Sequence, residues 1–354
     1  MKEDRKKIRV GIRGAAGLLG SRLASAAARS SDLECTAGVV VRDQTLERLL
    51  ERIQINPQLK RELPTRMYLD ASSRDAVTAL NAEQGLIRFE HIDKLALNRE
   101  CDVVVDTVYP HGRNPFADQY QHFRGFILLQ DGAYPEGQLI VPPLTSANPA
   151  GAKQLRMSDC ILSGVVPLLY PFKDITDGVR LQVLMQFDRR EADYMIMERV
   201  NTVTVRRDLA DRVQNQLGDL LPQQRVRVNL VVQIPSLLHY CVTIHIQCRE
   251  FLTHEQALER LGQMPHVALL PFGVTSTYDL NLARAFDDRI PPIMVVRDAL
   301  EPRPGASSCF LQIVAFLYYR TVAVLPNLDA IRMLGRGLDP LQAMRQTDRE
   351  MGFA

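Results

Sequence analysis

The amino-terminal segment constrains the fold most, because it joins a short apolar strand to a glycine-rich turn and a helix. Residues 8–12 form the expected strand, and the turn Gly14-Ala-Ala-Gly17-Leu-Leu-Gly20 follows directly. Small and apolar residues at helical spacing continue to Ser30, and a second strand is expected over residues 33–41. A helix N-terminus that follows such a turn offers backbone N–H groups to a dinucleotide pyrophosphate. We therefore expect this segment to bind a dinucleotide through Gly14, Ala15, Ala16, Gly17, Leu18 and Leu19.

The end of the second strand bears on which dinucleotide would bind. Arg42 comes first, and a guanidinium suits the 2′-phosphate of NADP. Asp43 follows directly, and a carboxylate at this place suits the ribose of NAD. Both residues can also be solvated turn residues, so the sequence leaves NADP and NAD open.

Further strands and helices alternate along the first half of the chain. Apolar runs at residues 101–108 and 126–132 have the texture of buried parallel strands, and helices are expected at residues 46–61 and 116–122. Such alternation is typical of a doubly wound α/β sheet. The first half of the chain therefore indicates a Rossmann-type domain.

The pattern changes after residue 175. Residues 179–187, 225–234 and 240–249 alternate partly between apolar and polar side chains, which predicts a mainly antiparallel sheet with few helices between the strands. At 354 residues the chain suits two domains. We expect a dinucleotide-binding domain over residues 1–158 plus 328–354 and a catalytic, substrate-binding and oligomerisation α+β domain over residues 159–327.

Two helix signals lie near the end of the chain. Thr253-His-Glu-Gln256 predicts a helix that begins with a capping box. Residues 327–351 predict two helices separated near 335–337, where two glycines lie.

Cys160 is the candidate nucleophile. Polar and small residues precede it, and an apolar run at helical spacing follows it. This order places a thiol at a helix N-terminus, where unpaired N–H groups and the helix dipole stabilise a thiolate. The alternative is that Cys160 is one more buried small hydrophobic residue, as most intracellular cysteines are.

Composition excludes several classes of function. The net charge of +2 gives no reason to expect binding to nucleic acid or to a membrane. The longest apolar run is too short to span a bilayer, and the charged amino terminus has no signal region. The six cysteines form no C-x-x-C pair, so we expect no metal. Without a signal region, we expect reduced thiols and a cytoplasmic protein.

Beyond these patterns, the chain resembles the archaeal-type (type II) glyceraldehyde-3-phosphate dehydrogenases. The amino-terminal glycine turn is similar to that family's phosphate loop, and residues 153–164 are similar to its nucleophile segment, with Cys160 and Gly164 at the matching places. His239 follows Cys160 by 79 residues, about the spacing at which the family has its catalytic histidine. Where the family has an asparagine and a threonine after the cysteine, this chain has Ile161 and Leu162.

The resemblance implies a set of functional residues. Cys160 and His239 would be the nucleophile and the base, and Ser163, Arg189 and Arg190 would bind a phosphorylated or anionic substrate. Thr107, Gln130 and Gly132 would join the glycine turn and Arg42 in holding NADP or NAD. Separately from the resemblance, the apolar strands of a mainly one-sided sheet predict a homo-oligomer, either a tetramer or a dimer.

The implied reaction interconverts an aldehyde and an acyl phosphate, or an acid, through a thioester on Cys160. Two alternatives stay open at this stage. The same scaffold can carry a reductase that transfers hydride directly to an imine or ketone, or it can bind a cofactor without catalysis. His239 alone, without that spacing, would be read as a hydrogen-bonded structural residue.

Overall fold

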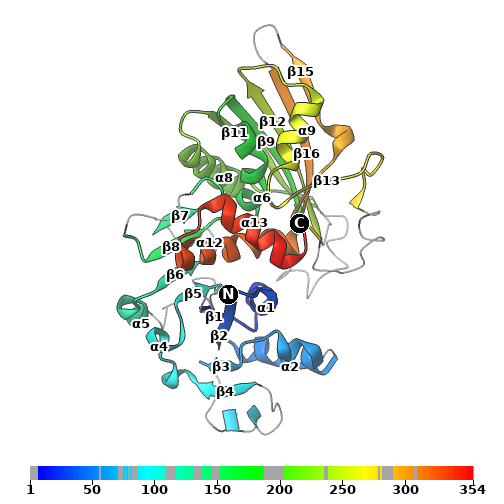
Figure 1. Ribbon diagram of the computed structural model, residues 1–354. Helices are drawn as coiled ribbons and strands as arrows, with labels where there is room; N and C mark the ends of the chain where they lie inside the picture. The colour runs from blue at the N-terminus through cyan, green and yellow to red at the C-terminus, as the bar shows by residue number, and fades with distance from the viewer. Residues whose placement is uncertain are drawn as a thin grey trace, which may run out of the picture. The chain divides into compact units, whose positions relative to one another are not determined.

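A computed structural model describes the chain and divides it into two compact units (Figure 1). Unit 1 comprises Met1–Asp159 and Ala323–Gly352, and unit 2 comprises Cys160–Val322. The residues that the structure describes are 7–55, 57–70, 75, 77–78, 80–81, 87–108, 117–130, 137–145, 151–186, 203–234, 238–277, 280, 290–305 and 309–353.

Unit 1 contains, within those residues, an eight-stranded parallel sheet in the order β4-β3-β2-β1-β5-β6-β8-β7. Its strands are β1 (Ile8–Arg13), β2 (Leu33–Val40), β3 (Arg66–Leu69), β4 (Arg88–His91), β5 (Val103–Asp106), β6 (Phe126–Leu129), β7 (Gln138–Ile140) and β8 (Gln154–Met157). The strand order reverses between β1 and β5, and ligands of open α/β sheets bind beyond the carboxyl ends of the strands at such a point. The predicted doubly wound sheet is confirmed.

The helices described in unit 1 come from both ends of the chain. They are α1 (Leu18–Arg29), α2 (Asp43–Ile55), α4 (Leu97–Glu100), α5 (Ala117–His122), α12 (Leu325–Arg336) and α13 (Pro340–Met351), with short 3₁₀ turns at Pro57–Arg61 and Ile92–Lys94. The single helix predicted over residues 46–61 is wrong in extent, because α2 begins at Asp43 and ends before Pro57. The two predicted terminal helices are confirmed, and Gly337 ends α12 in the left-handed conformation with φ of 65°.

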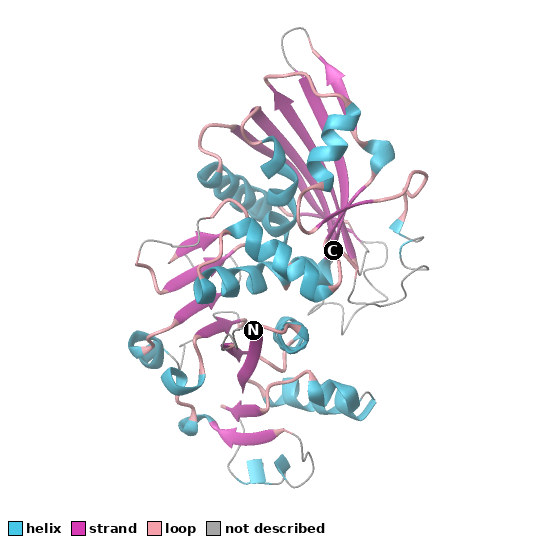
Figure 2. Cartoon of the chain, viewed as in Figure 1, coloured by secondary structure: helices cyan, strands magenta, loops and turns pink. Residues whose placement is uncertain are grey.

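Unit 2 is built on a second sheet; Figure 2 draws the strands of both sheets in magenta. Among its described strands the order is β10-β11-β9-β12-β16-β14-β13, with β15 also paired to β16. The strands are β9 (Thr176–Gln186), β10 (Thr204–Val205), β11 (Arg225–Ile234), β12 (His239–Cys248), β13 (Val267–Leu269), β14 (Ile293–Val295), β15 (Glu301–Pro304) and β16 (Cys309–Tyr318). Most neighbouring pairs are antiparallel, as expected.

Two pairs in this sheet depart from the antiparallel pattern, because β11 runs parallel to β9 and β13 runs parallel to β14. A parallel pair needs a crossover, and α8 (Arg207–Leu220) lies between β9 and β11 in the chain and packs on β11. The expectation of few helices between these strands missed α8.

The other helices among the described residues of unit 2 are short. They are α6 (Cys160–Leu169), α9 (His254–Gly262) and α11 (Tyr319–Val322), with 3₁₀ turns at Tyr170–Phe172 and Arg297–Ala299. Thr253 and Gln256 form the predicted capping box at the start of α9. None of the described helices is long and apolar enough to cross a membrane.

Candidate functional site

The glycine turn between β1 and α1 is held tightly against β2. The backbone N–H groups of Gly14 and Ala15 both donate to the carbonyl oxygen of Val39, at 2.8 and 3.0 Å. Gly14 has φ of 84°, a conformation that favours glycine. A side chain at this position would also collide with Thr107 Oγ1, which would lie 2.5 Å from a Cβ atom.

The turn also packs closely on its own helix. A Cβ atom on Gly20 would lie 2.2 Å from the carbonyl oxygen of Gly14, and one on Gly17 would lie 3.0 Å from the same oxygen. α1 begins at Leu18, so the N–H groups of its first turn have no intrahelical acceptor. The turn therefore packs tightly on α1, and the first N–H groups of α1 are available to a pyrophosphate.

The predicted cofactor residue Thr107 supports this turn directly. Its hydroxyl donates to the carbonyl oxygen of Arg13 at 2.8 Å, and its backbone N–H donates to the same oxygen at 3.0 Å. The carboxyl ends of β1 and β5 are thereby joined at the point where the strand order reverses. Thr107 is half-buried and lies beside Gly14.

A buried ion pair beside this turn was missed by the sequence analysis. Arg13 Nη1 donates to Asp106 Oδ2 at 2.8 Å, and both side chains are almost fully buried. The Tyr120 hydroxyl donates to the same carboxylate oxygen at 3.0 Å. Opposite charges at the ends of two adjacent apolar strands were the signal that could have revealed this pair.

Of the remaining predicted cofactor residues, the structure describes Gln130 and Arg42. Gln130 is buried, and its side-chain oxygen accepts a hydrogen bond from Asn327 Nδ2 on α12 at 2.7 Å. Arg42 is exposed just after β2, and its carbonyl oxygen accepts hydrogen bonds from Thr45 in the first turn of α2. Gly132 lies outside the described residues.

In unit 2, Cys160 is the first residue of α6, as its sequence context predicts. The helix is buried along most of its length, and Ser163 is 6% exposed. Gly164 brings α6 close to the sheet, because a Cβ atom there would lie 2.4 Å from Leu317 Cδ1 on β16. This contact fixes the start of the helix, and hence the thiol, relative to the sheet.

The thiol of Cys160 meets Tyr240, which the sequence analysis did not single out. Cys160 Sγ lies 3.1 Å from the Tyr240 hydroxyl oxygen. Tyr240 is the second residue of β12 and pairs with Leu317 across the sheet, so it lies on the face against which α6 packs. Cys160 is half-buried, in contrast to Cys35, Cys101, Cys248 and Cys309, which are buried.

His239 precedes Tyr240 and is the first residue of β12, where the sequence analysis expected it. Its ring packs on Tyr318, with centroids 5.2 Å apart, and these two residues are register partners on β12 and β16. Alternation along a strand therefore places the His239 and Tyr240 side chains on opposite faces of the sheet. Burial lowers the pKa of His239 from 6.5 to about 4, so its ring is neutral at neutral pH.

The structure thus joins Cys160 to Tyr240 and His239 to Tyr318. The catalytic pairing of Cys160 with His239 stays a prediction. The predicted substrate residues Arg189 and Arg190 lie outside the described residues. No group of three or more acidic, histidine or cysteine side chains that could hold a metal ion occurs in the described part of the chain.

Comparison with solved structures identifies similar folds among aspartate-semialdehyde dehydrogenases. The chain is similar to a probable enzyme of this name from Pseudomonas aeruginosa, with a TM-score of 0.64 and 12% identity over 94% of this chain and 99% of that one. The enzyme from Candida albicans, described with NADP, gives 0.61 and 12% over 99% and 100%. Aspartate-semialdehyde dehydrogenase II from Vibrio cholerae, described as complexed with ASA, gives 0.66 and 10% over 94% and 99%.

No family model matches the chain, and no curated protein matches it either. At 10–12% identity the three similarities establish the fold, which confirms the predicted class of a Rossmann-type sheet with a second α+β domain. They do not support the narrower resemblance to archaeal-type glyceraldehyde-3-phosphate dehydrogenases, since these neighbours are named for a different aldehyde.

Proposed function

We propose that the chain is an NAD(P)-dependent oxidoreductase that interconverts an aldehyde and an acyl phosphate, or an acid, through a thioester on Cys160. The observation that carries the proposal is the half-buried Cys160 thiol at the first residue of α6, hydrogen-bonded to Tyr240. The glycine turn of unit 1 supports it, because it has the shape that a dinucleotide needs. Three solved structures of similar fold are named as dehydrogenases of an aldehyde, one of them described with NADP.

The chemistry of the thiol follows from its place at the helix start. A thiolate there is stabilised by the first N–H groups of α6 and attacks the aldehyde carbonyl carbon, so that a carbon–sulfur bond forms. The same N–H groups stabilise the oxyanion that develops. After oxidation to the thioester, inorganic phosphate displaces the sulfur to give an acyl phosphate, or water displaces it to give an acid.

His239 is proposed as the base that takes the proton from the hydroxyl group of the thiohemiacetal on Cys160 while this adduct is oxidised to the thioester. Burial lowers the pKa of His239 and keeps the imidazole neutral at neutral pH, which is the form that a base needs. Because the His239 and Tyr240 side chains lie on opposite faces of the sheet, the proposal requires a substrate held on Cys160 to reach His239 at the start of β12.

The glycine turn of unit 1 fits a nicotinamide cofactor. Gly14, Gly17 and Gly20 let the turn pack closely on Thr107 and on α1, and Leu18 and Leu19 begin α1 with N–H groups that have no intrahelical acceptor. When bound, the cofactor accepts or supplies the hydride of the reaction. Ala15, Ala16, Arg42, Thr107, Gln130 and Gly132 are proposed to complete its site, with NADP and NAD both retained.

The substrate is proposed to be a small anionic aldehyde or its phosphorylated acid. Arg189 and Arg190 are retained as its anion-binding residues, and Ser163 as a further substrate residue, from the sequence resemblance. We also propose a homo-oligomer, either a dimer or a tetramer.

The decisive experiment follows turnover and thiol reactivity together. Purified protein is assayed for NADP and NAD reduction with a panel that includes aspartate semialdehyde and glyceraldehyde 3-phosphate, with and without inorganic phosphate. We expect one aldehyde to be oxidised, Cys160→Ser to abolish turnover, and Cys241→Ser to retain it. Cys241 is a matched control because it is also half-buried, and burial raises the pKa of its thiol.

Two outcomes would refute the proposal and favour another function. Turnover that survives Cys160→Ser would indicate direct hydride transfer to an imine or ketone. Cofactor binding measured by calorimetry without turnover of any aldehyde would indicate a non-catalytic relative.

A further inference from the structure

We propose that Tyr240 is a further catalytic residue, whose hydroxyl donates a hydrogen bond to the Cys160 thiolate and stabilises it as nucleophile and as leaving group. This inference rests on the proposed function, because it assigns Tyr240 to the same sulfur atom. The carrying observation is the distance of 3.1 Å between Tyr240 Oη and Cys160 Sγ.

The contact is built into the fold of unit 2. Tyr240 is 5% exposed and lies inside β12, which pairs with β9 on one side and β16 on the other. Its register partner Leu317 packs against Gly164 of α6. The tyrosine and the cysteine therefore lie on two elements that are packed against each other, so the hydroxyl is positioned before any substrate binds.

The surroundings of Cys160 explain why a tyrosine would be needed there. Ile161 and Leu162 follow the cysteine, and both are buried apolar side chains that offer no hydrogen bond. A sulfur anion beside apolar groups is costly unless donors face it. The Tyr240 hydroxyl supplies a side-chain donor in addition to the N–H groups at the start of α6.

The hydrogen bond acts at two stages of the reaction. In the free enzyme, the phenol keeps its proton and donates to the thiolate, which raises the fraction of Cys160 that is ionised near neutral pH. When phosphate attacks the thioester carbon, the carbon–sulfur bond breaks and its electron pair returns to the sulfur. The phenol then stabilises the departing thiolate, with no net transfer of its proton.

Alkylation of Cys160 by iodoacetamide, followed by peptide mass spectrometry across a pH series, measures this effect without substrate or cofactor. We expect Tyr240→Phe to move the midpoint of the pH profile upward by about one unit and to slow labelling near neutral pH about ten-fold. Tyr170→Phe is the matched control, because Tyr170 lies just after α6 in the same unit and its ring contacts Lys173. It should leave the profile unchanged.

A second measurement covers the case in which Tyr240→Phe fails to fold. Replacement of all tyrosines by 3-fluorotyrosine makes the phenol a stronger donor while keeping its shape. With labelling restricted to pH values below phenol ionisation, the profile should then move downward. An unchanged profile in Tyr240→Phe, or in the fluorinated protein when the variant does not fold, would overturn the role of Tyr240.

The test also separates this inference from the proposed function. If Cys160 in the unaltered protein is alkylated no faster than Cys241, the sulfur is not an activated nucleophile and both proposals fail. If Cys160 is alkylated fast and Tyr240→Phe labels at the same rate, the tyrosine role alone is refuted.

Discussion

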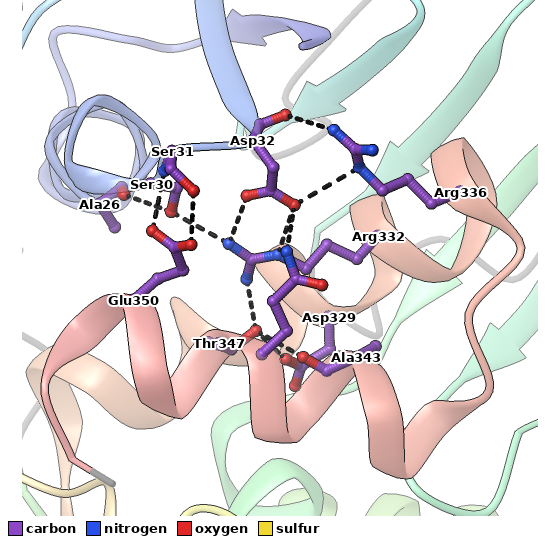
Figure 3. A network of polar contacts seen from close by, with 11 residues as sticks. Ala26, Ser30, Ser31, Asp32, Asp329, Arg332, Arg336, Ala343, Thr347 and Glu350 are labelled. Carbon is purple, nitrogen blue, oxygen red and sulfur yellow. Dashed lines mark hydrogen bonds and ion pairs between the residues drawn. The ribbon is translucent and has the colours of Figure 1, made fainter. Parts of the chain in front are cut away.

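Replacement of Arg332 tests whether one buried guanidinium holds the carboxyl-terminal helices in unit 1. Arg332 lies on α12 and is fully buried. Its Nε and Nη2 atoms donate to the two carboxylate oxygens of Asp32 at 3.1 and 2.9 Å (Figure 3). Nη2 also donates to Ser30 at 3.1 Å, and Nη1 donates to Thr347 on α13 at 2.6 Å. One side chain thus links α12, α13 and the turn between α1 and β2.

The cost of Arg332→Met follows from what it leaves behind. Asp32 would keep a hydrogen bond from Gln346 at 2.8 Å and a weaker ion pair with Arg336 at 3.6 Å. Ser30 and Thr347 would keep their own acceptors. Breaking a buried ion pair costs about 3–5 kcal/mol, and these remaining partners place the expected loss at about 3 kcal/mol.

The loss is measured as the change in the free energy of unfolding from urea titrations followed by circular dichroism. Arg336→Met is the matched control, because that side chain is 15% exposed and its contacts with Asp32 are longer. Its Nε lies 3.6 Å from the Asp32 carboxylate, and its Nη2 lies 3.5 Å from the Asp32 carbonyl oxygen. It should cost about 1 kcal/mol. Adding Asp32→Asn to Arg332→Met removes the uncompensated carboxylate and should recover more than 1 kcal/mol of the loss.

A loss below about 1 kcal/mol for Arg332→Met would refute the reasoning, because a buried carboxylate that has lost a bidentate partner should lower the free energy of unfolding by more than this. The reasoning would also fail if Asp32→Asn added its own cost to that of Arg332→Met. Additive costs would mean that the two side chains do not depend on each other.

Two other changes give distinct outcomes. Gly14→Ala should destabilise the protein by about 1–3 kcal/mol and weaken calorimetric NADP binding, whereas Gly151→Ala, at a similar positive φ with open space around it, should lower stability without weakening binding. His239 binds a proton more weakly in the folded chain than in the unfolded one, so stability should be full above pH 6.5 and fall by up to about 3 kcal/mol as the pH drops to about 4. His239→Gln should flatten this part of the urea-midpoint profile; equal slopes in both proteins would contradict the burial argument.

Local patterns predicted the elements well where the determinants lie within a few residues of each other. The glycine turn with α1, the start of α6 at Cys160 and the capping box at Thr253 all depend on such neighbours. The parallel pairing of β9 with β11 was missed because helix α8 was not recognised between the two strands. Leu209, Val213 and Leu217, apolar residues four apart that are buried along α8, were the signal that could have revealed it.

Some features of the candidate site could likewise be predicted from neighbouring residues, and others depend on the fold. The start of a helix at a thiol and the glycine turn after the first strand could be predicted from the residues alone, because backbone geometry and helix termini are properties of short segments. The contacts of Tyr240 with Cys160 and of Asp32 with Arg332 became visible only in the folded chain. Residues so far apart in the chain meet because strand register and helix packing bring them together, and no local pattern records which side chains will face each other.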